Sequence, residues 1–142
     1  MPVVRNPQFY FREGFCWTDV NSTHLKSRLK SNGVFDVLSM SLFTLTDIPD
    51  WYFVCMINSQ MISLYVDNFI NNTSHFQIND ARQLPIVIPS QKQLNTFKML
   101  FEKAVSIKKQ QFASSVSNSE VETKLNAIQE EVDSLVNILY GI

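Results

Sequence analysis

The last third of the chain carries the pattern that most limits its fold. Apolar residues recur there at alternating steps of four and three, at Val121, Leu125, Ile128, Val132, Leu135 and Leu139. This heptad spacing places one apolar seam along an α-helix, and a partner helix must cover that seam. Ser119-Glu120-Val121-Glu122 predicts a capping box at its start, and Gly141 is typical of a helix end. We therefore predict a helix over residues 120–140.

A second amphipathic segment precedes this helix. Ser90 is a predicted N-cap, and residues 91–112 carry an apolar stripe of Leu94, Phe97, Phe101, Ala104 and Val105. A serine-rich link over residues 114–119 separates the two segments. Residues 91–112 carry a net charge of +4 and residues 113–142 carry −4. A short link and opposite charges predict an antiparallel helical hairpin, or coiled coil, over residues 90–142. The hairpin either closes on itself or pairs with a second copy as a homodimer.

Residues 1–89 predict a separate α/β (α+β) domain with a short mixed sheet and packed helices. Alternating or β-rich runs predict its strands, at Phe9–Phe11, Phe15–Trp17, Leu25–Lys30, Val34–Leu38 and Ser41–Leu45. Asn32-Gly33 is a turn signal, and Gly14 predicts positive φ or close packing.

Two helices are predicted after these strands. Asp47 is the expected cap of a buried helix that spans Trp51–Ile57, and Ser59 is the expected cap of Gln60–Ile70. The second helix has an apolar face of Met61, Leu64, Tyr65 and Phe69, which we assign to the core.

The stretch from Phe69 to Pro89 joins the two parts. It contains a polar run, Asn71-Asn72-Thr73-Ser74-His75, that tolerates irregular backbone and offers hydrogen bonds outward. It ends in Pro85-Ile86-Val87-Ile88-Pro89, which predicts a three-residue strand with a proline at each end. A polar loop beside a rigid strand can hold recognition groups. The alternative is an ordinary connection between a helix and a strand.

Composition excludes several classes of protein. No apolar run is long enough to cross a membrane, and the first residues do not resemble a signal peptide. Two cysteines, Cys16 and Cys55, form no disulfide framework, so we expect a cytoplasmic protein. His24 and His75 lack neighbours at metal-ligand spacing, so we expect no metal and no other cofactor.

The same search finds no set of catalytic residues. Asn6-Pro7-Gln8-Phe9 is close to the Asn-Pro-Pro-Tyr/Phe motif of amino-methyltransferases, but Gln8 replaces the second proline and no glycine-rich cofactor loop precedes it. No Ser/His/Asp set, Cys/His pair or phosphate-binding loop is present. We therefore expect that this chain by itself is not an enzyme.

Three segments in order resemble target recognition domains, the specificity domains of bacterial restriction-modification systems. Arg12–Ser22, with Gly14-Phe15-Cys16-Trp17-Thr18, is similar to their Gly-Ile-Thr-Trp-Ser segment. Gln83–Pro89 is similar to their closing Leu-Pro-Ile-Pro-Ile-Pro-Pro segment. Leu139-Tyr140-Gly141-Ile142 resembles the Leu-Tyr-Gly-Leu end of their last helix. Cys16, Val87 and Ser90 depart from the family pattern, as does the net charge of −1.

The resemblance implies the specificity region of a type I S subunit, or the C-terminal part of a type IIG-like adenine methyltransferase-endonuclease. Such a module recognises double-stranded DNA without catalysis and links it to methyltransferase or restriction subunits. A net charge of −1 argues against autonomous DNA binding but not against a part of a larger complex. The alternatives are a protein-interaction or oligomerisation module without DNA binding, and a piece of a larger enzyme.

The resemblance and side-chain chemistry together select candidate DNA-binding residues. Arg28 and Lys30, which share one face of their predicted strand, are assigned to phosphates. Asn71, Asn72, Ser74, His75 and Gln77 are assigned to bases or backbone. A solvated-loop role is the alternative for each of them. Trp17 is expected in the core, and Arg82 is expected to cap a helix or pair with Asp80.

Overall fold

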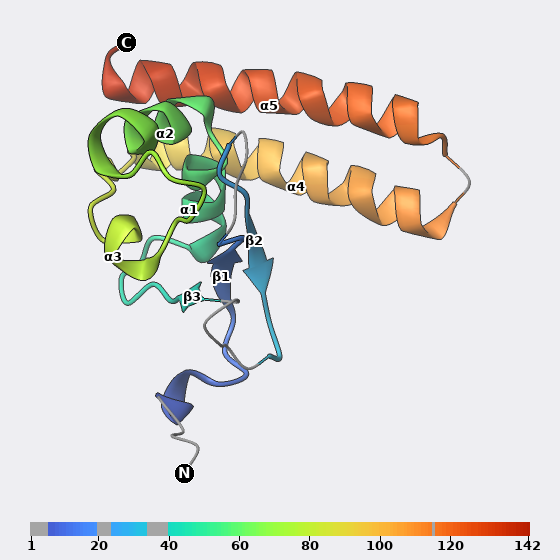
Figure 1. The fold of residues 1–142 in the computed structure, drawn as a ribbon. Coiled ribbons are helices and arrows are strands. Elements are labelled where there is room, and N and C mark those ends of the chain that lie inside the picture. The colour runs from blue at the N-terminus through green and yellow to red at the C-terminus, as the bar shows by residue number, and fades with distance from the viewer. Residues whose placement is uncertain (1–5, 20–23, 34–39, 115) are drawn as a thin grey trace.

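The computed structural model describes residues 6–19, 24–33, 40–114 and 116–142. It shows a small α+β body with two long helices lying across one end (Figure 1). The prediction of an α+β fold that ends in two long helices is confirmed. Within the described residues, no helix is both long and apolar enough to cross a membrane.

The sheet has three strands: β1 (Gly14–Trp17), β2 (Ser27–Lys30) and β3 (Ser41–Leu42). Their order is β2-β1-β3, and both pairs are antiparallel, so within the described residues the predicted mixed sheet is wrong. β1 is buried along its whole length, since α1 and the strands on either side cover it. A Cβ at Gly14 would lie 2.6 Å from the Leu42 carbonyl oxygen, which is the predicted close packing.

Two predicted strands differ in the structure. Residues Pro7–Phe9 form a short 3₁₀ helix, η1, instead of part of a strand. Phe11 follows with a φ of 63°, which breaks any extended run. The strand predicted at residues 41–45 is shortened to β3, since Asp50 accepts a hydrogen bond from the Thr44 backbone and bends the chain there. The strand predicted at residues 34–38 lies outside the described residues.

The helix α1 (Asp50–Ile57) is buried as predicted, with Tyr52 and Met56 fully enclosed. Its predicted cap is wrong, because Pro49 occupies the N-cap position and Asp47 makes no capping bond. Ser59 does cap α2 (Gln60–Tyr65), since its hydroxyl accepts a hydrogen bond from the Ile62 backbone.

After Tyr65, α2 continues as a wider π-helical turn, η2 (Val66–Ile70). The predicted apolar face of this region is wrong in part: Leu64 is 55% exposed and Phe69 is 74% exposed. Ile62 and Val66 are buried instead, one position further along the helix. The sequence offers two overlapping apolar stripes here, and the second is the one that enters the core cluster with Leu25, Ile57 and Phe76.

The Pro85–Pro89 segment forms no strand, which corrects the prediction. It follows the short helix α3 (Ile78–Ala81) and is held by two tyrosine hydroxyls. Tyr52 donates a hydrogen bond to the Val87 carbonyl at 2.8 Å, and Tyr140 donates to the Pro85 carbonyl. The prolines remove ladder donors, so side chains from α1 and the last helix take the place of a pairing strand.

The hairpin consists of α4 (Gln91–Ala113) and α5 (Asn118–Tyr140), which lie side by side and antiparallel (Figure 1). Ser90 forms the capping box of α4 with Gln93. The predicted cap of α5 is wrong by two residues: Ser117 accepts the hydrogen bond from the Glu120 backbone, and the helix begins at Asn118. The apolar seam of α5 faces inward as predicted, with Val121, Ile128 and Val132 buried.

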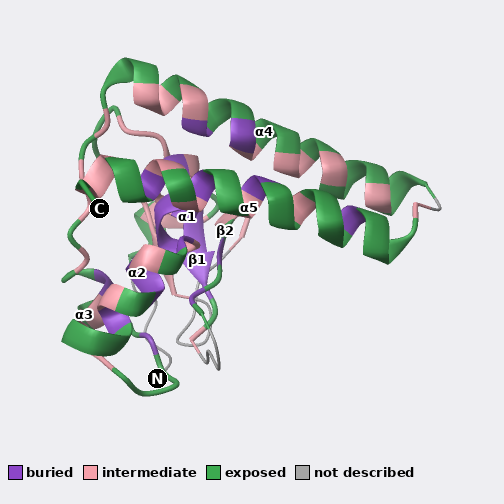
Figure 2. Cartoon of the chain, turned by 90° about the horizontal axis from the view of Figure 1, so that it is seen from above, coloured by how far each residue is buried: buried purple, intermediate pink, exposed green. Residues whose placement is uncertain are grey.

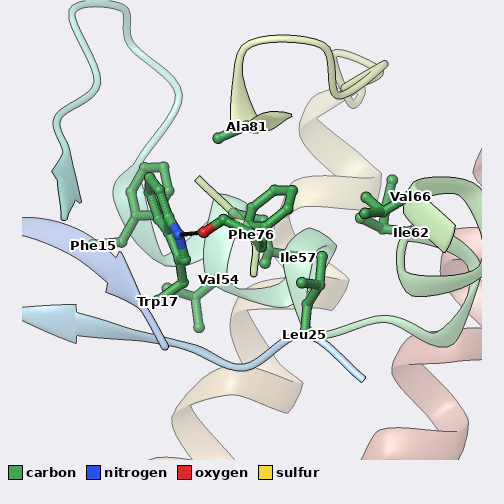
Figure 3. Close-up of a cluster of buried hydrophobic side chains, with 9 residues drawn as sticks. All are labelled: Phe15, Trp17, Leu25, Val54, Ile57, Ile62, Val66, Phe76 and Ala81. Atoms are coloured by element: carbon green, nitrogen blue, oxygen red, sulfur yellow. Dashed lines mark hydrogen bonds between the residues drawn. The ribbon is translucent and has the colours of Figure 1, made fainter. Parts of the chain in front are cut away.

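Two apolar clusters meet at α1, and Figure 2 shows that buried residues concentrate there and on the inner faces of the hairpin. One cluster joins the sheet, α1 and α2 around Phe15, Trp17 and Phe76 (Figure 3). The other joins Tyr52 and Met56 of α1 to Phe97 of α4 and Val136 of α5. The division into residues 1–89 and 90–142 stays a prediction.

Candidate functional site

The polar loop Asn71–Gln77 is ordered by its own first side chain. The Asn71 amide oxygen accepts a hydrogen bond from the Thr73 backbone at 2.9 Å. The amide nitrogen of the same residue donates to the His75 carbonyl at 2.8 Å and to the Asp80 carboxylate at 3.1 Å. Asn71 is therefore a residue that folds the loop, because both polar atoms of its side chain form hydrogen bonds within the loop or to the start of α3.

The other end of the loop is held by the sheet. Phe76 is 2% exposed and packs edge-on against Trp17. The indole nitrogen of Trp17 donates a hydrogen bond to the Phe76 carbonyl at 2.8 Å, which Figure 3 shows as a dashed line. The Phe76 backbone N–H donates to the Asp19 carbonyl at 2.9 Å. Trp17 is thus a core residue, as expected, and it fixes the loop to the end of β1.

Between these anchors, three predicted residues face solvent. The side chains of Asn72 and Ser74 are exposed and make no hydrogen bond with the described part of the chain. The His75 ring is also exposed, and its Nδ1 lies 3.1 Å from the Asp19 carboxylate. An amide, a hydroxyl and an imidazole are therefore presented together on a backbone that is fixed at both ends.

Gln77 occupies the boundary between the loop and α3. Its backbone N–H donates a hydrogen bond to the Asp80 carboxylate at 2.9 Å, and the residue is exposed. Arg82 lies at the C-cap position of α3, which is the first of its two expected roles, and its side chain donates to the Asn79 side chain at 3.3 Å; it forms no ion pair with Asp80.

The loop borders a half-open hollow with a volume of about 470 Å³, which we call the loop hollow. Its floor contains Leu25, Val66 and Phe76, and its rim is polar. The complete lining is His24, Leu25, Ser63, Val66, Asp67, Asn71, Asn72, Thr73, Ser74, His75 and Phe76. Sequence reasoning did not select His24 or Asp67, because they lie on other elements and carry no motif.

Arg28 and Lys30 do not line the loop hollow. They lie on β2, where Arg28 pairs with Cys16 and Lys30 pairs with Gly14. The loop instead meets the opposite end of β1, at Trp17 and Asp19. The cation nearest this end is Lys26, which directly precedes β2 and continues the alternation of the other two, although no motif in the sequence points to it.

The chemistry of this surface is hydrogen bonding. Within the described ranges, no three His, Cys, Asp or Glu side chains come together in a way that could hold a metal ion. Asn6, of the methyltransferase-like Asn6–Phe9 segment, is exposed and lies just before η1. Amide, hydroxyl and imidazole groups of the loop can bind base edges or phosphates, and the cations of β2 can bind phosphates.

The sequence matches no protein-family model, and no curated protein is significantly similar to it.

Proposed function

We propose that this chain is a non-catalytic DNA recognition module of a restriction-modification system, which links its target to methyltransferase or restriction subunits. One observation carries the proposal: the Asn71–Gln77 loop is fixed at both ends while Asn72, Ser74 and His75 face solvent. Anchoring of this kind stabilises any loop. In a loop that recognises bases it also favours binding, because a preorganised side chain loses less entropy on binding.

Residue chemistry supports double-stranded DNA as the ligand. Asn and Gln can form two hydrogen bonds with adenine, and His and Ser can bind bases or phosphates. The cations of β2 lie on a strand that pairs directly with the strand holding the loop. The balanced net charge of −1 supports binding within a complex, where another subunit supplies the remaining phosphate contacts.

The test is a size-exclusion run of the full chain with and without a candidate methyltransferase partner from the same genome, followed by selection from random duplexes. We expect the complex to enrich one short motif and the chain alone to enrich it weakly. Omission of the chain from the complex is the control, and it should remove the motif. A stable complex that enriches no motif would refute DNA recognition.

A second candidate function is a protein-interaction or oligomerisation module, and the hairpin favours it. Met99, Phe112 and Ile138 are 67%, 86% and 69% exposed, although each is large and apolar. The two helices also carry opposite charges, so an α4 of one copy can face an α5 of another in a homodimer. Light scattering of the full chain tests this: a dimer that Phe112→Ser dissociates would support it, and a monomer over a wide concentration range would exclude self-association.

A further inference from the structure

The cations of β2 and the lysine just before it form a regular row. Lys26, Arg28 and Lys30 alternate with Leu25, Ser27 and Leu29, which turn toward the body. Side chains two apart on a strand lie on one face at a spacing of about 7 Å. We call Lys26, Arg28 and Lys30 the cationic row. Lys26 and Arg28 are exposed, and neither forms an ion pair with a described carboxylate.

The residues across from the row carry no charge. The Thr18 backbone N–H donates a hydrogen bond to the Lys26 carbonyl at 3.0 Å. Thr18, the residue just after β1, therefore lies opposite Lys26. Cys16 lies opposite Arg28, and Gly14 lies opposite Lys30. Opposite charges that face each other across a ladder stabilise a pair of strands. Lys26 and Arg28 have no such acid opposite them, which leaves these two cations available to an anionic ligand.

The row is also aligned with the loop. Its Lys26 end is at the end of β1 that holds Phe76, and His24, two residues before Lys26, lines the loop hollow. β2 is an edge strand of the described sheet, since none of the described residues forms a further strand on its outer side. Its outer edge is instead closed by side chains: Asn58 hydrogen bonds to both backbone groups of Ser27, and Ser63 accepts from the Leu25 backbone. The edge is therefore blocked to a pairing strand while Lys26 and Arg28 stay exposed.

We propose that the cationic row is a phosphate track, which holds the backbone of one DNA strand and directs it into the loop hollow. This assigns Lys26 as a further positioning residue and gives the direction in which the DNA runs. A separation of about 7 Å between neighbouring cations corresponds to about two base-pair rises of a duplex. The inference rests on the proposed function, because the track positions the DNA that the loop recognises.

The test uses the full chain in its methyltransferase complex, with two probes of equal length: the selected duplex and a random-sequence duplex. Lys26→Gln and Arg28→Gln should each weaken binding to both probes by the same factor. Each should also lower the slope of log K against log salt by about 1, as the loss of one phosphate contact does. Lys26→Arg should restore the slope.

Lys103→Gln is the matched control, because Lys103 is an exposed cation of α4 that is not on the row. It should leave the salt slope unchanged, and thermal melting of every variant should show an intact fold. If wild type binds the selected duplex but Lys26→Gln and Arg28→Gln behave like the control, the track is refuted and the recognition module stands. If their losses are confined to the selected duplex, these side chains contact bases and the track is refuted. If wild-type complex binds neither probe, both proposals fall.

Discussion

Asn71 and Asn72 are adjacent and identical in chemistry, yet they have opposite roles in the loop. The amide of Asn71 is used by Thr73, His75 and Asp80, whereas the amide of Asn72 faces solvent. The backbone of Asn71 is extended, with φ −159° and ψ 114°, and this turns its side chain across the loop. A polar side chain that forms hydrogen bonds with its neighbours stabilises the fold. A polar side chain without such hydrogen bonds is free to bind a ligand.

This difference predicts separate effects for two alanine variants. Asn71→Ala should lower the free energy of unfolding by about 1–2 kcal/mol, because one donor, the Thr73 N–H, and two acceptors, the His75 carbonyl and the Asp80 carboxylate, lose a partner. Asn72→Ala should change it by less than about 0.5 kcal/mol, as expected for an exposed side chain. In the methyltransferase complex, Asn72→Ala and Gln77→Ala should relax the enriched motif. Urea unfolding and duplex selection measure the two effects, and an unchanged motif in both variants would remove these residues from recognition.

At the scale of elements, the ends of helices and strands are set by single polar side chains. Ser117 begins α5 and Ser90 begins α4, each through a hydrogen bond to the third residue of its helix. Asn58, just after α1, takes the position of a neighbouring strand beside β2 by donating to and accepting from Ser27. These hydrogen bonds supply partners for backbone N–H and C=O groups that have none within their own helix or sheet.

The start of α5 gives a prediction at this scale. Ser117→Ala should lower stability by about 1 kcal/mol, since the Glu120 N–H loses its acceptor at the helix N-terminus. Ser119→Ala is the matched control, because Ser119 is already inside the helix and should change stability much less. Thermal unfolding of both variants measures the difference. An equal loss from both would contradict the assignment of Ser117 as the cap.

At the scale of the whole molecule, α1 is the element on which both apolar clusters depend. Val54 and Ile57 face the sheet, while Tyr52 and Met56 face the hairpin. The hydroxyl of Tyr52 also holds the Val87 carbonyl, so the connecting segment is fixed to the same helix. The body and the hairpin therefore stabilise each other through one buried helix.

This arrangement predicts that residues 1–89 alone do not fold stably. Removal of the hairpin would expose Tyr52 and Met56, which are 0% exposed in the full chain, and burial of such side chains contributes about 1.5–3 kcal/mol each. We expect the isolated segment to give a broad melting transition and to aggregate, whereas the full chain unfolds cooperatively. A sharp two-state transition for residues 1–89 would contradict this. For the same reason, DNA binding is best tested with the full chain.

The buried face of α1 also predicts loss of stability in alkali. Burial raises the pKa of the Cys55 thiol to about 12 from an ordinary value of 9.0, and burial likewise raises the pKa of Tyr52. Above pH 9 the unfolded chain releases the thiol proton while the folded chain retains it. The unfolded state then binds fewer protons, so the free energy of unfolding falls as pH rises from about 9 toward 12.

The contribution of Cys55 should approach about 1.4 kcal/mol per pH unit in that range. Urea unfolding at pH 8, 9 and 10 measures it, with Cys55→Ala as the comparison. The variant should be less stable than wild type at pH 8, because it leaves a small cavity, but it should lose stability more slowly between pH 9 and 10. Equal slopes for the two proteins would show that the thiol does not contribute.

The sequence by itself determined the features that depend on local spacing. The heptad seam of α5, the stripe and cap of α4, the buried α1 and the Ser59 cap all follow from residues within one or two turns of each other. The same local chemistry indicated that Asn71–His75 would be an irregular polar loop. Such features need no knowledge of what lies across the core.

Only the tertiary structure decided which of two equivalent local choices is used. Ile62 and Val66 are buried, and Leu64 and Phe69 are exposed, because only one of two overlapping stripes enters the core cluster that contains Leu25 and Phe76. The Pro85–Pro89 segment pairs with tyrosine hydroxyls since Tyr52 and Tyr140 are brought to it from 35 and 55 residues away. Asp19 reaches His75 across 56 residues in the same way. Contacts of this kind depend on where the whole chain folds back, and no short stretch of sequence encodes that.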